Sequence, residues 1–203
     1  MIVDLLNTWD DMNNLEISVA KATLICHANR EKLYQSDYQR SNTVKNCIKA
    51  GHESTLEHMF LQFDIQFISR ACLQELSRHR LMSLSVESTR HTLKKQIFND
   101  NWITEAYSHI PPHCKEIFDD DIAFLREKSK TLDNDKLKYF LREYWPTSLV
   151  LTVNARELRH IIKLRSNPAA LKEFQDLARN MYREIPDEFK YIFEDCLYKE
   201  VKE

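Results

Sequence analysis

The sequence predicts an α+β fold in which helices pack around a small, mostly antiparallel sheet. Residues 61–67 alternate between apolar and polar side chains, which is the pattern of a strand with one buried face. Stretches with the spacing of amphipathic helices outnumber such strands. At 203 residues, the chain has the length of one domain with a full hydrophobic core. We therefore expect residues 1–203 to form a single domain.

The first half of the chain contains several helix-end signals. In order, we expect a strand at residues 2–6, helices at 15–28 and 41–50, the strand at 61–67, and a helix that Ser69 caps and that ends at Arg78. Gly51 is the only glycine of the sequence, and it suits the left-handed conformation that ends helices. Ser54 and Glu57 have the spacing of a capping box.

In the second half, we expect a strand at residues 91–97, helices at 114–130 and 133–145, a buried strand at 148–153, a helix after it, and last helices at 168–185 and from 187 to the end. The helix after the buried strand carries Leu158, Ile161 and Ile162 on one face. Arg165 falls on the same apolar stripe. Because an unpaired buried charge is costly, Arg165 needs an anionic or carbonyl-rich partner.

Charge and cysteine content argue against several classes of protein. The net charge is −2, which does not favour binding to nucleic acid or to an anionic membrane surface. The N-terminus lacks the cationic start and apolar stretch of a leader, and no segment reaches the roughly 18 apolar residues of a membrane span. The five cysteines form no C-x-x-C pair, which fits reduced thiols. We expect a cytoplasmic protein.

Residues 78–90 form the most unusual segment, with three arginines, one histidine and three serines. Arginine offers a fork of donors that matches phosphate or carboxylate, and serine hydroxyls add further donors. The P-loop and the dinucleotide fingerprint both need several glycines, so a chain with one glycine has neither. Any nucleotide phosphate must therefore be held by side chains.

Three stretches resemble one family. The string R-H-R, seven residues, then serine (Arg78, His79, Arg80 and Ser88) is similar to the signature of flavin-dependent thymidylate synthases. Residues 51–58 and the run from Asn154 to Arg165 match the family at the corresponding places, and the resemblance covers roughly residues 45–185. It implies reductive methylation of dUMP to dTMP, with methylenetetrahydrofolate as carbon donor and FAD, reduced by NADPH, as hydride source. It also implies a homotetramer with sites built across subunits, and no cysteine nucleophile.

The resemblance assigns roles to individual residues. Those implied to contact FAD are His52, Ser54, Arg78, His79, Arg80, Asn154, Arg156 and His160. Those implied to bind dUMP are Glu75, Arg78, Ser88, Thr89, Arg90, Lys138 and Arg165. Arg165 is the implied catalytic residue, because it would help the uracil ring to ionise.

Several positions stay open at this point. Many relatives have asparagine in place of Ser85 and tyrosine in place of His91. Gln74 competes with Glu75 for the place that faces the pyrimidine. Arg156 and His160 share a helix face and are also compatible with a plain surface pair, and Lys138 with a solvated lysine. The sequence does not fix a preference between NADPH and NADH.

Two other functions would use some of the same residues. A metal-dependent hydrolase would use His52, Glu57, His58 and His79, but the second histidine follows six residues after the first, which is not zincin spacing. We therefore expect no metal site. A nucleic-acid-binding module would use the arginine-rich segment, but no aromatic residues are interleaved with its arginines.

Overall fold

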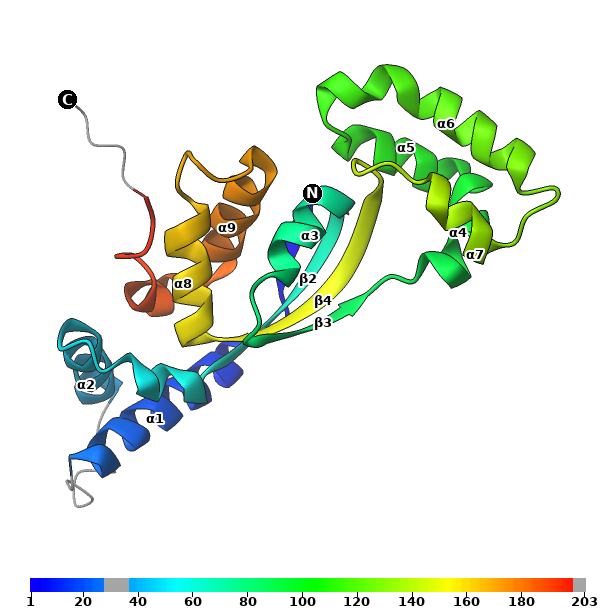
Figure 1. The fold of residues 1–203 in the computed structure, drawn as a ribbon. Coiled ribbons are helices and arrows are strands. Elements are labelled where there is room, and N and C mark those ends of the chain that lie inside the picture. The colour runs from blue at the N-terminus through cyan, green and yellow to red at the C-terminus, as the bar shows by residue number, and fades with distance from the viewer. Residues whose placement is uncertain (28–36, 199–203) are drawn as a thin grey trace, which may run out of the picture. The chain divides into compact units, whose positions relative to one another are not determined.

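The computed structural model describes residues 1–27 and 37–198. It has the predicted α+β class, with helices around a small antiparallel sheet of four strands in the order β1-β2-β4-β3 (Figure 1). The strands are β1 Ile2–Leu5, β2 Phe60–Ser69, β3 Met82–Val86 and β4 Pro146–Asn154. Strands predicted at residues 2–6, 61–67 and 148–153 are thereby confirmed.

Helices make up most of the described residues outside the sheet. The α-helices are α1 Trp9–Cys26, α2 Asp37–Lys49, α3 Arg70–Ser77, α4 Thr89–Ile97, α5 Asp100–His109, α6 Lys115–Lys128, α7 Asn134–Leu137, α8 Ala155–Arg165 and α9 Lys172–Glu184. The 3-10 helices are η2 Glu53–His58, η3 Pro112–Cys114, η4 Lys138–Phe140 and η5 Asp187–Ile192.

The chain forms two compact units. The first comprises Met1–Ile2, Ile65–Arg78 and Ser85–Val150, and the second comprises the described residues of Val3–Asp64, His79–Leu84 and Leu151–Glu203. The boundary passes through the strands. Folding of the two units as a single domain stays a prediction.

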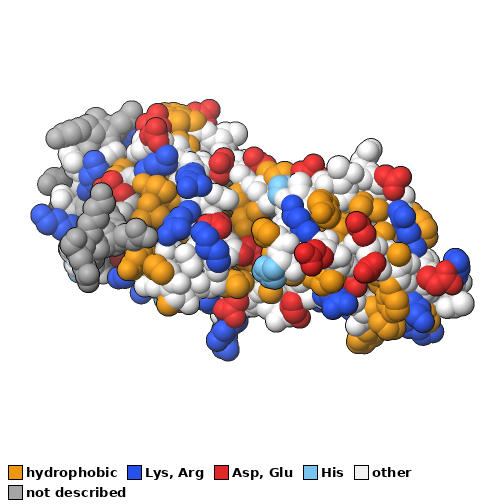
Figure 2. All heavy atoms as spheres, turned by 90° about the horizontal axis from the view of Figure 1, so that it is seen from above, with side chains coloured by type: hydrophobic (Ala, Val, Ile, Leu, Met, Phe, Trp, Pro, Cys, Tyr) orange, Lys and Arg blue, Asp and Glu red, His pale blue; other side chains and the backbone are white. Residues whose placement is uncertain are grey.

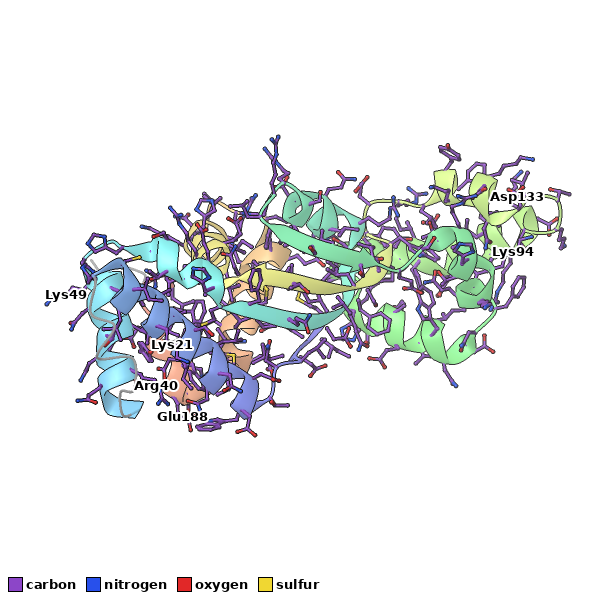
Figure 3. All side chains as sticks on the ribbon, turned by 90° about the horizontal axis from the view of Figure 1, so that it is seen from below. Lys21, Arg40, Lys49, Lys94, Asp133 and Glu188 are labelled. Atoms are coloured by element: carbon purple, nitrogen blue, oxygen red, sulfur yellow. The ribbon has the colours of Figure 1, made fainter. Side chains whose placement is uncertain are left out.

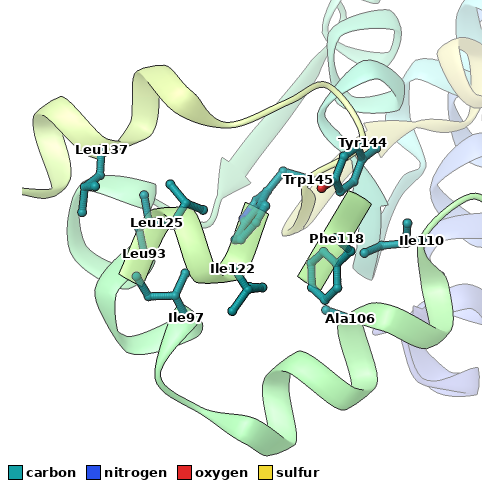
Figure 4. Close-up of a cluster of buried hydrophobic side chains, with 10 residues drawn as sticks. All are labelled: Leu93, Ile97, Ala106, Ile110, Phe118, Ile122, Leu125, Leu137, Tyr144 and Trp145. Carbon is teal, nitrogen blue, oxygen red and sulfur yellow. The ribbon is translucent and has the colours of Figure 1, made fainter. Parts of the chain in front are cut away.

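The first unit has its own apolar core, to which α4, α5, α6 and α7 contribute (Figure 4). The core residues are Leu93, Ile97, Ala106, Ile110, Phe118, Ile122, Leu125, Leu137, Tyr144 and Trp145. Helices α4 and α7 also pack on each other, with the amide of Lys94 donating to Asn134 Oδ1 at 3.2 Å. Figure 3 labels Lys94 of α4 and Asp133, the residue that precedes α7.

The strand predicted at residues 91–97 is wrong, because this segment is helix α4. Leu93 and Ile97 lie four positions apart, and both are fully buried in the core of the first unit. Positions i and i+4 lie on one face of a helix and also on one face of a strand, so this spacing does not distinguish the two. The strand of this region lies earlier, at Met82–Val86.

The helix predicted at residues 133–145 is much too long. Asp133 does cap a helix, since its side chain accepts from the amide of Lys136, but α7 ends at Leu137 and η4 at Phe140. Trp145 precedes Pro146, and the residue before a proline is disfavoured in a helix. The chain instead enters strand β4 at Pro146.

Other helix boundaries also differ from the predictions. Helix α1 begins at Trp9 rather than residue 15, because Thr8 and Asp11 form a capping box. Ala28, its predicted end, lies outside the described residues. Helix α5 was not predicted; Asn99 caps it. Helix α9 starts at Lys172 rather than 168, and the last predicted helix is only η5.

Two of the helix-end signals predicted from the sequence are confirmed, and the predicted capping box is wrong. Gly51 has a φ of 75° after α2, and Ser69 caps α3 by accepting from the amide of Cys72, both as predicted. The capping box predicted for Ser54 and Glu57 does not form. Residues 53–58 are a 3-10 helix that begins without a side-chain cap, and Glu57 pairs with Arg156 instead.

Strand β2 departs from simple alternation at Phe67. This residue has a φ of 58°, which is the left-handed region that a bulky side chain rarely occupies. Before it, Leu61, Phe63 and Ile65 are buried alternately; after it, Ile68 and Ser69 are both buried. Phe67 itself is only partly buried and stacks on His109, with ring centroids 5.0 Å apart. The left-handed residue therefore breaks the two-residue period that the sequence predicts.

Candidate active site

Helix α8 in the second unit carries many of the predicted site residues. Asn154 caps it, because Asn154 Oδ1 accepts from the amide of Glu157 at 2.9 Å. The stripe of Leu158, Ile161 and Ile162 is fully buried, as predicted. Arg165 is the last residue of the helix and is partly buried. The cap and the stripe together fix the direction in which α8 presents its polar side chains.

His79 joins two residues of α8. It lies between α3 and β3, with only 7% of its surface exposed. His79 Nδ1 lies 3.1 Å from Glu157 Oε1, and Arg165 Nε donates to His79 Nε2 at 3.1 Å. The guanidinium of Arg165 also lies over the ring of Phe174, 4.8 Å from its centroid. The R-H-R segment and α8, far apart in sequence, therefore meet in one site.

These contacts fix the proton on His79. An arginine Nε carries a hydrogen and has no acceptor, so His79 Nε2 must accept, and the ring is neutral with its hydrogen on Nδ1. That hydrogen is donated to Glu157. Burial lowers the pKa of His79 below its ordinary value of 6.5, while the hydrogen bond that His79 donates to Glu157 opposes the shift. The histidine is therefore uncharged at neutral pH.

A cavity of about 580 Å³ lies in the second unit. It is lined by Glu53, Leu81, Arg156, Glu157, Arg159, His160, Lys163, Asp195 and Cys196. Its volume falls within the range of pockets for small ligands and cofactors. The cations Arg156 and Lys163 and the imidazole of His160 give it several donors for an anionic ligand.

The cavity wall holds a network that the sequence analysis missed. Arg159 is 5% exposed and donates to both oxygens of Asp195, at 2.6 and 2.7 Å, and to Glu53 at 3.0 Å. It also donates to the carbonyl of Ile192. The hydrogen bond from Arg159 holds the pKa of Asp195 below its usual value. Arg159 lies four positions after the buried Ala155 and three before the buried Ile162, so a charge in line with apolar residues, the signal used for Arg165, also indicates Arg159.

The predicted FAD contacts are only partly brought together. Arg156 and His160 both line the cavity, and the ring of His160 lies 5.7 Å from that of His79. Arg156 Nη1 donates to Glu57 at 2.6 Å. His52, Ser54 and Arg80 are exposed and do not line the cavity.

The predicted phosphate-binding residues gather in the first unit. Ser88 occupies the N-cap position of α4, yet its hydroxyl does not bond the amides of the helix. Arg90 donates to both oxygens of Asp135, at 2.6 and 2.9 Å, and this bond lowers the pKa of Asp135. Lys138 adds positive charge near Asp135. A helix N-terminus with an uncommitted hydroxyl and two cations nearby is suited to an anion.

Glu75 and Gln74 are both engaged within the first unit. Arg78 Nη1 donates to Glu75 at 3.1 and 3.3 Å. Gln74 Nε2 donates to the two oxygens of Glu143, at 3.0 and 2.9 Å.

No group of three or more histidine, cysteine, aspartate or glutamate side chains is arranged to hold a metal within the described ranges 1–27 and 37–198. His79 is committed to Glu157 and Arg165 through its two ring nitrogens. The four residues named for a metal-dependent hydrolase therefore form no such cluster.

Comparison with known proteins places the chain in a family. The family model described as "Thymidylate synthase complementing protein" matches residues 5–189. The flavin-dependent thymidylate synthase of Campylobacter jejuni strain RM1221 is 38% identical over 177 residues, which are 83% of this chain and 84% of the relative. This chain belongs to the flavin-dependent thymidylate synthases. The enzyme of Helicobacter pylori strain J99 is 40% identical over 166 residues, 72% of this chain and 76% of the relative.

Solved structures of the same family share the fold of this flavin-dependent thymidylate synthase. A crystal structure of the Helicobacter pylori enzyme complexed with FAD and dUMP has a TM-score of 0.81 and 31% identity, and the match covers 98% of this chain and 100% of the other. A second structure of that enzyme with FAD and dUMP has a TM-score of 0.80 and 32% identity, with the same coverage.

Charged side chains of both signs lie on the surface of this flavin-dependent thymidylate synthase. Figure 2 shows acidic and basic side chains interspersed over one face. In the part of the chain that the structure describes, no helix is both long and apolar enough to span a membrane. The five cysteines, all within the described residues, form no disulfide, and Cys196 is the one that lines the cavity. Burial raises the pKa of Cys196 to about 12, so it is a thiol at neutral pH.

Proposed function

We propose that this enzyme converts dUMP to dTMP by reductive methylation, with methylenetetrahydrofolate as carbon donor and FAD, reduced by NADPH, as hydride source. The observation that carries the proposal is the arrangement of His79 between Glu157 and Arg165, residues 78 and 86 positions away along the chain. It joins the two family motifs in one site. The Helicobacter pylori structures, which contain FAD and dUMP, support the same substrate and cofactor.

The residues around the cavity fit FAD. The pyrophosphate of FAD is anionic, and Arg156, His160 and Lys163 provide donors on one side of the cavity. Within the described residues, the buried Nε of Arg159 has no hydrogen-bond partner, so the wall holds one more unused donor. When bound, FAD would supply the hydride chemistry, and the protein would supply its orientation.

Arg165 is the proposed catalytic residue. Its Nε donates a hydrogen bond to His79, and because the His79 ring is neutral, it does not repel the positive charge of the guanidinium. Contact with the Phe174 ring adds a second constraint on the guanidinium plane. A guanidinium fixed in this way can stabilise negative charge that develops on the uracil ring without reorganising during the reaction.

The N-terminus of α4 is the proposed site of the dUMP phosphate. Ser88 and Thr89 would contribute a hydroxyl and backbone amides, and Arg90 and Lys138 would contribute positive charge. Glu75 and Arg78 would contact the nucleotide, while His52, Ser54, Arg78, Arg80 and Asn154 would contact FAD, as the resemblance implies.

Release of tritium from 5-tritiated dUMP tests the proposal. Purified protein with methylenetetrahydrofolate, FAD and NADPH should release tritium and form dTMP, and leaving out any one component should stop dTMP formation. A parallel reaction with NADH measures the preference for reductant. The Arg165→Ala variant is the matched negative control. Failure to form dTMP with all components present and FAD bound would overturn the proposed function.

We also propose a homotetramer, as the family resemblance implies. Light scattering should give four times the mass of one chain, and a monomer would overturn this point. A cytoplasmic location stays a prediction from the sequence.

A further inference from the structure

Glu157 is a buried carboxylate to which neither the family motif nor the proposed chemistry assigns a role. It lies in the first turn of α8, with 9% of its surface exposed. Its amide donates to the capping Asn154, and its carboxylate faces His79 Nδ1 at 3.1 Å. A buried carboxylate needs a partner, and a neutral imidazole supplies only one hydrogen.

The ring nitrogen that carries this hydrogen decides whether His79 can accept a hydrogen bond from Arg165. With the hydrogen on Nδ1, His79 Nε2 has a lone pair that accepts from Arg165 Nε at 3.1 Å. With the hydrogen on Nε2, two N–H groups would face each other and the contact would be lost. A carboxylate can only accept, so Glu157 selects the first arrangement.

We propose that Glu157 is a positioning residue, which selects the tautomer of neutral His79 that is protonated on Nδ1 and thereby anchors Arg165 in its working orientation. The carboxylate never needs to touch substrate or cofactor. Only the expected effect on kcat rests on the proposed function. The tautomer of His79 is a property of the protein that can be measured without the reaction.

Few other groups compete for the ring of His79. The titratable or charged side chains of α8 that act on it are Glu157, His160 and Arg165. From α9, the ring of Phe174 meets it edge-on, with centroids 6.0 Å apart. Of these groups, Glu157 is the only carboxylate. Arg165 and His160 both oppose protonation of His79, and Glu157 favours it.

Nitrogen NMR of solid samples gives the first test. In protein labelled with 15N-histidine, with FAD bound and without dUMP, the His79 signals should show a protonated Nδ1 and an unprotonated Nε2 at pH 8. Loss of these signals in His79→Gln identifies them. In Glu157→Gln, the amide can either accept or donate, so a second tautomer should appear. Glu16→Gln is the matched control, because Glu16 is also buried and bonded, to Ser41 and Tyr191, but does not contact His79.

Kinetics give the second test. Glu157→Gln should lower kcat by roughly 10- to 100-fold, the range for an outer partner that orients an imidazole, with little change in KM for dUMP. Adding Glu157→Gln to His79→Gln should cost almost nothing more, because the carboxylate acts through the histidine. The fall of turnover at acid pH should move to lower pH in Glu157→Gln, because the carboxylate raises the pKa of His79.

The outcomes separate the inference from the proposed function. An Nε2-protonated His79 in the wild-type protein overturns the inference, and this measurement does not depend on a Glu157 variant. The inference is also overturned if Glu157→Gln lowers kcat as much in the His79→Gln background as in the wild type. It is overturned as well if the fall of turnover at acid pH does not move in Glu157→Gln. The expected tautomer in a protein that forms no dTMP would instead leave the positioning intact and overturn the proposed reaction.

Discussion

Arg90 and Asp135 form a two-point ion pair in which Nε and Nη2 of the arginine donate to the two carboxylate oxygens, at 2.6 and 2.9 Å. Both side chains are more than half exposed, so the pair contributes little to folding stability. It instead holds the guanidinium beside the N-terminus of α4, where Ser88 keeps its hydroxyl uncommitted.

The first prediction concerns phosphate binding by Arg90. Arg90→Ala should weaken dUMP binding by about 10- to 100-fold, the scale of one charge-assisted hydrogen bond, and should leave the melting temperature nearly unchanged. Calorimetric titration measures the affinity. Lys130→Ala removes one exposed positive charge elsewhere in the same unit and should bind dUMP normally. Equal affinities of the Arg90 variant and wild type would place the phosphate elsewhere.

The second prediction is that substitution of Arg165 lowers the rate of turnover more than it weakens ligand binding. Because negative charge on the uracil is greater in the transition state than in bound dUMP, Arg165→Ala should lower methyl transfer by about 10² or more while FAD stays bound. Arg165→Lys should restore little, since an ammonium lacks the Nε–H that donates to His79 and the planar fork. Single-turnover rates and flavin absorbance measure both effects. A colourless Arg165→Ala protein that melts early would mean that Arg165 holds the fold.

Cys196 tests whether any thiol takes part in the chemistry. It lines the cavity, but its raised pKa keeps it protonated and therefore weakly nucleophilic. Cys196→Ser should keep turnover, and iodoacetamide should modify Cys196 slowly at pH 7. The buried Cys72 and the partly buried Cys114 should likewise tolerate serine without loss of chemistry. Loss of methyl transfer in one of these variants, with fold and flavin intact, would point to a thiol mechanism.

Asn154 has a structural role that can be separated from its predicted contact with FAD. Asn154→Ala should lower the free energy of unfolding by about 1 kcal/mol, because the cap on α8 is lost. Asn154→Asp should preserve stability, since aspartate caps equally well. If the amide also contacts FAD, both variants should bind FAD less tightly. Urea denaturation and flavin titration separate these effects, and equal destabilisation by both variants would contradict the capping role.

The ion pair of Arg159 and Asp195 predicts a dependence of stability on pH. Asp195→Asn should lower the free energy of unfolding by about 1 to 3 kcal/mol, less than for a fully buried pair, because Asp195 is half exposed and Glu53 still contacts Arg159. The pKa of Asp195 is lowered on folding, so its stabilisation is present above the ordinary value of 3.8 and is lost as pH falls through the folded pKa. The difference between wild type and variant should therefore stay constant from pH 8 to 5 and shrink below 4. A difference unchanged by acid would contradict this account.

Features that depend on neighbouring residues could be predicted from the sequence. The alternation in β2, the Ser69 cap, the left-handed Gly51 and the buried stripe of α8 all follow from residues a few positions apart. The R-H-R motif indicated the family for the same reason, since a motif is a local pattern. The α+β class followed because these local signals are sufficient to identify most elements.

The tertiary structure decided whatever depends on distant residues. Thr89–Ile97 is a helix because Leu93 and Ile97 enter a core built from four helices, which local spacing could not fix. Phe67 adopts its left-handed conformation in a strand that alternates normally up to that point. Arg165 donates to a histidine 86 positions away, which is held in turn by a carboxylate to which the family resemblance assigns no role. Such partners are chosen by packing, because burial forces each polar group to find a donor or acceptor within reach, wherever it lies in the sequence.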